Sequence, residues 1–253
     1  MYYLSVLAIL KNETMNLKMW IDHYLWQGVE HFYLIDNGSD DNPLDILIEY
    51  IDKNIVTYYY KPEKHKQVEH YRFVFDNAKL KNNTYWLIIS DLDEFFYGTD
   101  KKLITNLKKL EFYNVIYCNW LMFGHENLQD HPIDIRTSII HRDNNIHENT
   151  KYIFKPNKIH NSSQVWIHYL LDLNGNKMEN HPKIKIENNL IKLNHYPIQS
   201  LEFFTKVKMT RGAADTDTSD NIRNLTYFNN YNKNAIHKDT ILKNLIENCP
   251  ENY

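Results

Sequence analysis

The stretch YWLIISDLDEFF, residues 85–96, decides the interpretation of the fold, because a mostly apolar run leads directly into three carboxylates. An apolar run of this length predicts a strand that is covered on both faces of a sheet. Asp91, Asp93 and Glu94 follow where that strand should end. Two carboxylates at i and i+2 in such a turn can point to one open edge and offer oxygen ligands to a divalent cation.

The segments before this stretch alternate between strand and helix patterns. Apolar runs predict further strands at residues 4–10, 31–36 and 54–60. Helical spacing of apolar residues predicts helices over residues 16–27, 44–52 and 67–81. Strands separated by helices of this length form βαβ units with right-handed crossovers. The predicted fold class is therefore α/β, with a mostly parallel central sheet flanked by helices.

Three polar loops follow the predicted strands. They are KNET (11–14), DNGSDD (36–41) and DLDE (91–94). Ligands of parallel sheets bind beyond the carboxyl ends of the strands. The three loops are therefore expected to face a common ligand at one edge of the sheet.

The pattern changes after residue 110. Residues 114–123 predict a strand, and 125–190 read as short strands and loops rich in His and Asn. A helix is predicted over 200–211, closed by Gly212, and a last helix near 238–248.

Composition excludes several classes of protein. The 253 residues carry a net charge of -3 without a basic stripe, which gives no reason to expect nucleic acid as a partner. Two cysteines exclude a disulfide scaffold, and no run of 18 apolar residues predicts a transmembrane segment. The first ten residues are typical of a core strand and not of a signal peptide, so we expect a soluble cytoplasmic protein.

Other acidic motifs fit the cluster poorly. An EF-hand loop needs further oxygen ligands and a glycine at its sixth position, and the haloacid-dehalogenase phosphatases carry D-x-D-x-T on the first strand. The loop after the first predicted strand has no glycine, which excludes a dinucleotide fingerprint, and six glycines overall argue against a P-loop. The remaining alternative is that Asp91 and Asp93 are solvated turn or N-cap residues.

Six motifs in order resemble the GT-A glycosyltransferases of the family 2-like and family 92-like group. They are KNE (11–13), WIDHYLWQGVEHFYLIDNGSDD (20–41), DLDEFF (91–96), WLMFG (120–124), KYIFKP (151–156) and NHYPIQSLEFFTKVKMTRG (194–212). The resemblance implies a single Rossmann-like GT-A domain with a smaller acceptor-side region of strands and loops and with C-terminal helices. Residues 1–110 would be its nucleotide-sugar-binding half, 111–212 its acceptor and metal-closing half, and 213–253 an extension.

The resemblance also implies roles at the acidic turn. Asp93 would bind Mn²⁺ or Mg²⁺, while Asp91 would contact the ribose or a water on the metal. Glu94 would support these two residues without binding the metal itself. His195 in NHY would be the third protein ligand, and imidazole suits Mn²⁺. The alternative for His195 is a structural role, with two other histidines, His160 and His168, as competing ligands.

A nucleotide would be bound by the loops after the first two strands. Asp36 can accept hydrogen bonds from a base or ribose, and Asn12 and Glu13 can line the same pocket, although turn formation accounts for such residues too.

The diphosphate would be bound by basic residues of the helix after NHY. Lys206 and Arg211 can make charge-assisted bonds to phosphate. A solvated helix face is the alternative reading, more so for Lys208 than for Arg211, and Arg72 is similarly ambiguous.

The acceptor would lie near Trp120 and Phe123. An inverting transferase needs a base beside the acceptor hydroxyl, and Glu126 is our first candidate. An exposed structural role for Glu126 is the alternative, and a retaining route would need no such base. Three other carboxylates compete for the role, Asp130, Glu148 and Asp172.

The predicted function is metal-dependent transfer of a hexosyl group from a nucleotide diphosphate sugar to a hydroxyl of a glycan or glycoprotein, with UDP as the expected nucleotide and inversion as the expected outcome. One alternative is a sugar-phosphate nucleotidyltransferase, although KNETMN lacks the glycine-rich basic loop of that class. Another is a non-catalytic GT-A-like protein that binds carbohydrate or nucleotide. Residues 125–190 could also form an oligomer interface.

Overall fold

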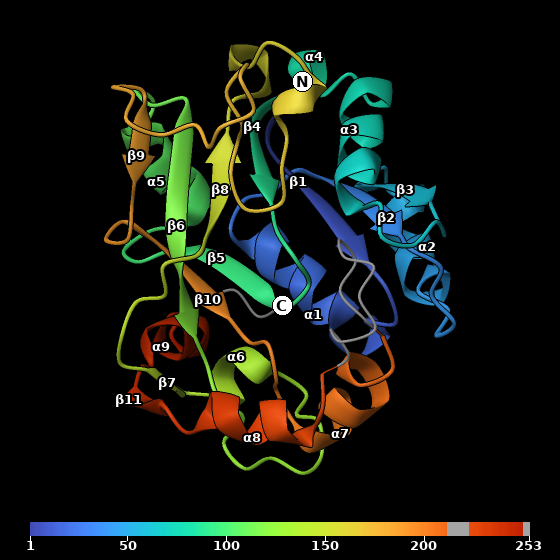
Figure 1. Ribbon diagram of the computed structural model, residues 1–253, viewed down its shortest axis with the longest axis vertical. Helices are drawn as coiled ribbons and strands as arrows, with labels where there is room; N and C mark the ends of the chain where they lie inside the picture. Colours follow the sequence, from blue (N-terminus) through green and yellow to red (C-terminus); the bar gives the residue numbers. More distant parts are fainter. Residues whose placement is uncertain (212–222, 250–253) are drawn as a thin grey trace.

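The computed structural model describes residues 1–211 and 223–249, and its central feature is a nine-stranded sheet (Figure 1). Its strands are β1 (Tyr2–Leu10), β2 (His31–Asp36), β3 (Val56–Tyr60), β4 (Thr84–Ile89), β5 (Glu94–Gly98), β6 (Val115–Met122), β8 (Thr150–Phe154), β9 (Ile184–Ile186) and β10 (Ile191–His195). The strand order is β3-β2-β1-β4-β8-β6-β10-β5, and β9 pairs with β6. A two-stranded sheet joins β7 (His141–Asp143) to β11 (Ala235–Lys238).

Most strand pairs of the large sheet are parallel. The pairs formed by β1 with β2 and β4, by β2 with β3, and by β6 with β9 and β10 are parallel. Strand β8 is antiparallel to both β4 and β6, and β5 is antiparallel to β10. The predicted α/β fold with a mostly parallel sheet is thus confirmed.

Helices cover both faces of the sheet (Figure 1). They are α1 (Thr14–Trp26), α2 (Leu44–Asp52), α3 (Gln67–Asn77), α4 (Leu80–Asn83), α5 (Leu103–Lys109), α6 (Ile135–Ser138), α7 (Leu201–Phe203), α8 (Leu225–Asn232) and α9 (Ile241–Glu247). One core cluster packs α1, α2, α5, α6 and α9 against the sheet, and a second packs α3 and α4 against the other face. Throughout the parts of the chain just described, no helix combines the length and apolar content needed to cross a membrane.

The continuous apolar runs follow from burial on both faces. Side chains of β1 alternate between the two cores, with Leu4, Val6, Ala8 and Leu10 in the first and Leu7 and Ile9 in the second. Strand β4 does the same, because Trp86 and Ile88 face the first core and Leu87 and Ile89 the second. A strand that is covered on both faces has no polar side, so its sequence shows no alternation.

The structure differs from the sequence prediction at several places, and two of its helices, α5 and α8, were not predicted. A strand, β5, begins at Glu94 directly after the acidic turn, where no strand was predicted. The predicted helix over 67–81 is interrupted, because Lys79 has a φ of 50° and separates α3 from α4. The predicted helix over 200–211 is α-helical only in α7 and continues as a π-helical turn, Phe204–Lys208. Gly212, its predicted stop, lies outside the described residues.

The predicted nucleotide-binding and acceptor halves share one sheet. Strands β8, β6 and β10 from the second half lie between β4 and β5 of the first half. The division at residue 110 is therefore a prediction about function, and the strands of the two halves interleave.

Candidate active site

The acidic turn connects β4 to β5 and is held by its own backbone and by α1. The amide of Asp91 donates to Glu94 Oε2 at 2.9 Å, and the amide of Glu94 donates to the Asp91 carbonyl at 3.1 Å. Trp20 Nε1 of α1 donates to the same carbonyl at 3.0 Å. Glu94 is fully buried, so its side chain fixes the turn that presents Asp91 and Asp93.

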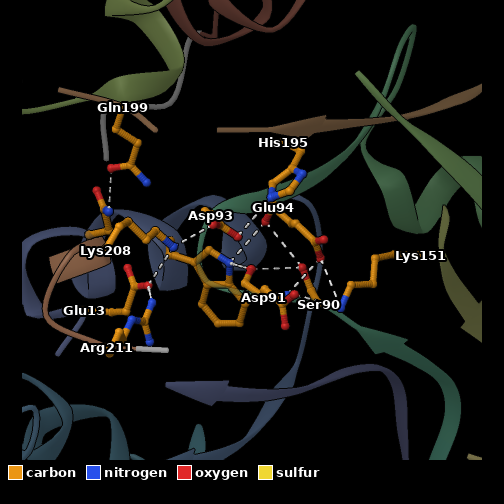
Figure 2. Close-up of polar contacts among 12 residues, drawn as sticks. Glu13, Ser90, Asp91, Asp93, Glu94, Lys151, His195, Gln199, Lys208 and Arg211 are labelled. Carbon is orange, nitrogen blue, oxygen red and sulfur yellow. Dashed lines mark hydrogen bonds and ion pairs between the residues drawn. The ribbon is translucent and has the colours of Figure 1, made fainter. Parts of the chain in front are cut away.

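Lys151 of β8 approaches the turn from one side (Figure 2). Its Nζ lies 2.9 Å from Asp91 Oδ2 and 3.8 Å from Glu94 Oε2, and its side chain is fully buried. Burial favours the neutral form of Asp91, but the charge and hydrogen bond of Lys151, together with His168, outweigh burial, and the pKa of Asp91 lies below its usual value. For Glu94 burial dominates and raises the pKa well above its usual value. Lys151 and Asp91 are therefore the ionic pair, and Glu94 is the carboxyl group whose ionised form is disfavoured by burial.

Asp93 meets a second set of partners on the opposite side (Figure 2). Lys208 Nζ lies 2.7 Å from Asp93 Oδ2 and 3.2 Å from Glu13 Oε1, and Arg211 also contacts Glu13 Oε1 closely. His195 Nε2 lies 3.5 Å from Asp93 Oδ1. Burial alone would raise the pKa of Asp93, but the charges of Lys208 and His195 hold it well below its usual value.

The segment that carries Lys208 is fixed to the rest of the site. Ser200 Oγ accepts from the Phe203 amide and caps α7, and the Asn16 amide group of α1 donates to Gln199 Oε1 at 2.8 Å. The following turn is π-helical, a geometry that often occurs at functional sites. This local geometry turns Lys208 toward the acidic turn.

Two residues of the cluster can contribute ligands to a divalent cation. Asp93 offers a carboxylate oxygen and His195 an imidazole nitrogen, and the 3.5 Å between them suits neighbouring ligands of one ion. Among the described residues no group of three or more His, Cys, Asp or Glu side chains is arranged to hold a metal ion by itself. Such a pair fits Mn²⁺ or Mg²⁺ when phosphate and water oxygens complete the coordination.

The residues predicted to bind the nucleotide lie at the same edge of the sheet. Asn12 Oδ1 accepts from the Asp40 amide, which ties the loop after β1 to the loop after β2. Asp36, at the end of β2, accepts from the Ser39 amide at 2.8 Å and from the Tyr58 hydroxyl at 2.7 Å. Both residues thus help to hold these loops in place, and their nucleotide contacts stay a prediction.

The structure changes the interpretation of the basic residues. Lys206 is exposed and pairs with Glu202 at 2.7 Å, whereas Lys208 is 3% exposed and sits in the acidic cluster. The assignment of Lys208 to a solvated face is therefore wrong. Arg211 contacts Glu13 in the cluster, and its phosphate contact stays a prediction, whereas Arg72 donates to the Ser163 carbonyl on another part of the surface.

Aromatic rings surround His195. The Trp120 ring lies 4.4 Å from the His195 ring and 5.3 Å from the His168 ring, measured between centroids. Burial, followed by the nearby Lys151 charge, lowers the pKa of His168 to about 4. Phe123 is buried and stacks on Tyr196, so it belongs to the core.

The other alternative for the third metal ligand, His160, lies apart from this ring cluster. Its backbone contacts are with Lys81 and Gln164.

Glu126 fixes the loop after β6. Its Oε1 accepts from the amides of Ile140 and His141 at 2.9 and 2.6 Å, and its carboxylate also contacts His141 Nδ1. These contacts are structural, and a role as base stays a prediction. The competing carboxylates include Asp172, which accepts from the Asn174 and Asn176 amides in a turn, and two exposed residues, Asp130 and Glu148.

Two residues of this site were missed by sequence reasoning. Lys151 lies in the motif KYIFKP, where a charge inside a buried strand was the available signal. Lys208 gave no such signal, because its orientation depends on the π-helical turn.

Comparisons with known proteins give the family. Residues 5–249 match the family model described as Glycosyltransferase family 92. A glycosyltransferase family 92 protein of Ricinus communis is 28% identical over 100 residues, which is 38% of this chain and 16% of that protein. The match thus spans about a sixth of the length of the curated relative.

Similar solved structures include TarS of S. aureus and HddC from Yersinia pseudotuberculosis. For TarS the TM-score is 0.48 with 13% identity, covering 90% of this chain and 43% of that chain. For HddC the TM-score is 0.47 with 13% identity, covering 81% of this chain and 97% of that chain. Likenesses of this size say nothing about substrates, whereas the family match covers almost the whole sequence. The chain belongs to glycosyltransferase family 92.

Proposed function

We propose that this chain transfers a hexosyl group from a nucleoside diphosphate sugar, with uridine as the nucleoside, to a hydroxyl of a glycan or glycoprotein. The bond between the anomeric carbon and the β-phosphate oxygen breaks, and a bond forms between that carbon and the acceptor oxygen. The nucleoside diphosphate leaves, and the proton of the acceptor hydroxyl passes to a base.

One observation carries this proposal. At the carboxyl edge of a parallel sheet, Asp93 lies between an imidazole and a buried ammonium group, with Arg211 close by on Glu13. Ligands of such sheets bind at this edge, and cations there can stabilise the charge that develops on a departing diphosphate. Membership of a glycosyltransferase family agrees with this use of the cluster.

We assign the divalent metal, Mn²⁺ or Mg²⁺, to Asp93 and His195. When bound, it would supply Lewis-acid stabilisation of the diphosphate. Arg211 would bind a phosphate oxygen, and Asp91 would accept a hydrogen bond from the ribose while Lys151 keeps it ionised. Asn12 and Asp36 would contact the nucleoside from the loops after β1 and β2.

We keep Glu126 as the candidate base for an inverting reaction. Glu126→Gln should lower the transfer rate roughly 100-fold or more, the usual size of a general-base contribution, and leave donor binding unchanged. Normal transfer by this variant would place the base elsewhere or indicate a retaining route. A rate loss with weaker donor binding would show that Glu126 only holds its loop.

The direct test of the proposed function is thermal unfolding with nucleotides. Each nucleoside diphosphate, its sugar conjugates and the corresponding monophosphates would be added with Mn²⁺ or with EDTA, because selective binding to the folded state raises its stability. We expect UDP and one UDP-sugar to raise Tm only with the metal, and that UDP-sugar to be consumed with release of UDP when a glycan acceptor is added.

Two outcomes would count against the proposal. Equal stabilisation in Mn²⁺ and EDTA would remove the metal from the function. The absence of stabilisation by every nucleotide would favour a non-catalytic protein of this family that binds carbohydrate.

A further inference from the structure

Lys208 occupies the place where the sequence predicts a metal contact. Its Nζ is 2.7 Å from one oxygen of Asp93 and 3.2 Å from Glu13, and all three side chains are less than one-tenth exposed. The other oxygen of Asp93 faces His195. Asp93 and His195, the two metal ligands assigned above, thus already have partners in this structure. The partner of the Asp93 carboxylate is Lys208.

Among the described residues, the carboxylates of this cluster and its Lys and Arg side chains balance in charge without a further ion. Glu13 and Asp93 bring two negative charges, and Lys208 and Arg211 bring two positive charges. A divalent cation added alone would leave this buried cluster with an excess charge of two, which is costly away from water. A diphosphate added with the cation would cancel that excess, because its oxygens carry negative charge.

The structure shows how Lys208 can change partners. A lysine side chain carries its charge on a flexible four-carbon stem. Lys208 is the last residue of the π-helical turn Phe204–Lys208, and Arg211 follows this turn. Arg211 already holds Glu13, so Glu13 stays paired if Lys208 moves away. Among the described residues of this cluster, Lys208 is therefore the cation whose departure frees Oδ2 of Asp93.

Resting on the proposed function, we propose that Lys208 is an internal counter-ion that leaves Asp93 for the diphosphate when the donor binds. Its ammonium group neutralises Asp93 in the ligand-free enzyme and binds a phosphate oxygen in the loaded enzyme. Metal and nucleoside diphosphate then bind cooperatively, and the metal binds weakly before the nucleotide arrives. Because linkage is reciprocal, the metal raises the affinity for the nucleotide by the same factor.

The test measures Mn²⁺ affinity, by electron paramagnetic resonance or calorimetry, with and without UDP. For the unaltered protein we expect UDP to tighten Mn²⁺ binding about 30-fold, within the usual range of coupling between sites. In Lys208→Met we expect Mn²⁺ alone to bind about 10-fold more tightly, UDP alone to bind about 10-fold more weakly, and the coupling to fall to a few-fold.

Two further variants separate this role from a structural one. Lys208→Gln keeps a hydrogen-bond donor without the charge. It takes the place of Lys208→Met in this measurement if that variant folds poorly, and the same changes in affinity are expected. Lys155→Met removes another buried lysine, which pairs with Glu111 at 2.9 Å beyond the other end of β8. This control should leave both affinities and their coupling unchanged.

The possible failures are distinguishable. Binding of UDP with an Mn²⁺ affinity that is indifferent to Lys208 would overturn the counter-ion role and leave the proposed function standing. Tight binding of Mn²⁺ to the unaltered protein without UDP would do the same. Absence of UDP binding in every protein, with and without Mn²⁺, would overturn the proposed function and this inference together.

Discussion

Two buried lysines reach the same acidic turn from opposite sides, and they differ in what holds them (Figure 2). Lys151 belongs to β8, an inner strand of the sheet paired with β4 and β6, and its charge is matched by Asp91. Lys208 ends a short π-helical turn that follows α7, and it shares Asp93 and Glu13 with Arg211 and His195.

The comparison indicates that one positive charge is part of the scaffold and the other can be exchanged. A lysine on a central strand cannot move without disturbing two neighbouring strands. A lysine at the end of a turn, whose partners have other cations beside them, can leave at a smaller cost in free energy. The predictions below test this difference, from the largest expected effect to the smallest.

Removing Asp93 should have the largest effect. It lies on the side of the turn that holds Lys208, called the exchangeable side below, where the chemistry is proposed. We expect Asp93→Ala to lower sugar transfer at least about 1000-fold, the upper range for loss of one group that stabilises transition-state charge. Steady-state rates at saturating donor and Mn²⁺ measure this effect. Asp91→Ala is the matched variant on the scaffold side, and a larger rate loss there than in Asp93→Ala would reverse the comparison.

Removing the scaffold lysine should mainly affect stability. Lys151→Met leaves the charge of Asp91 without its partner, and breaking a buried ion pair in this way costs about 3 kcal/mol. For Lys208→Met we expect a loss of about 1 kcal/mol, since Arg211 and His195 remain beside the carboxylates. Urea unfolding at pH 7 measures both values.

The ranking of the two stability losses is the decisive result. Lys155→Met is again the control, because its ion pair with Glu111 lies beyond the other end of β8, away from the acidic turn. If Lys208→Met were as destabilising as Lys151→Met, then Lys208 would belong to the scaffold too.

On the exchangeable side of the turn, replacing His195 should change metal binding and not stability. We expect His195→Ala to weaken Mn²⁺ binding in the presence of UDP roughly 10- to 100-fold, the scale seen when groups at a metal site are removed. Calorimetric titration of Mn²⁺ into the UDP complex measures it. His168→Ala is the matched histidine beside the same Trp120 ring, and a loss confined to that variant would transfer the ligand role to His168.

Much of the sheet could be predicted because local patterns specify it. Strands β1, β2 and β4 are apolar runs between helical segments, and the carboxylates at the end of β4 mark the edge that carries the candidate site. Strand β5 was missed because its pairing is non-local: Phe96 lies opposite Leu193, and nothing within Glu94–Gly98 indicates that partner.

The choice between two lysines could not be made from the sequence. Lys206 and Lys208 are two residues apart, so they lie on different sides of a helix, and the phase of the helix decides which one points inward. The π-helical turn Phe204–Lys208 has a wider spacing than the α-helix that the pattern predicted, which changes this phase. Whether a π-helical turn of this kind forms depends on packing against elements that are distant in the sequence.

The pH dependence of stability is the test with the smallest expected effect. Asp91 and Glu94 both lie beside Lys151, but their pKa values are shifted in opposite directions, so their contributions to stability should change with pH in opposite directions. Burial raises the pKa of Glu94 above its unfolded value of 4.5, so its contribution to stability is fully present below that value and is lost as pH rises through the folded pKa. Glu94→Gln stays neutral. The stability of this variant relative to the unaltered protein should therefore increase from about pH 5 to pH 8, by at most about 1.4 kcal/mol per pH unit.

Asp91→Asn supplies the opposite sign in the same measurement. The charge and hydrogen bond of Lys151, together with His168, outweigh burial and depress the pKa of Asp91, so this contribution is present above the unfolded value of 3.8 and is lost as pH falls through the folded pKa. The deficit of Asp91→Asn should be constant above about pH 5 and shrink below it. A difference for Glu94→Gln that stays flat from pH 5 to pH 8 would mean that Glu94 is ionised in the folded protein. Lys151 would then balance two carboxylates, and the scaffold side of the turn would carry a net negative charge.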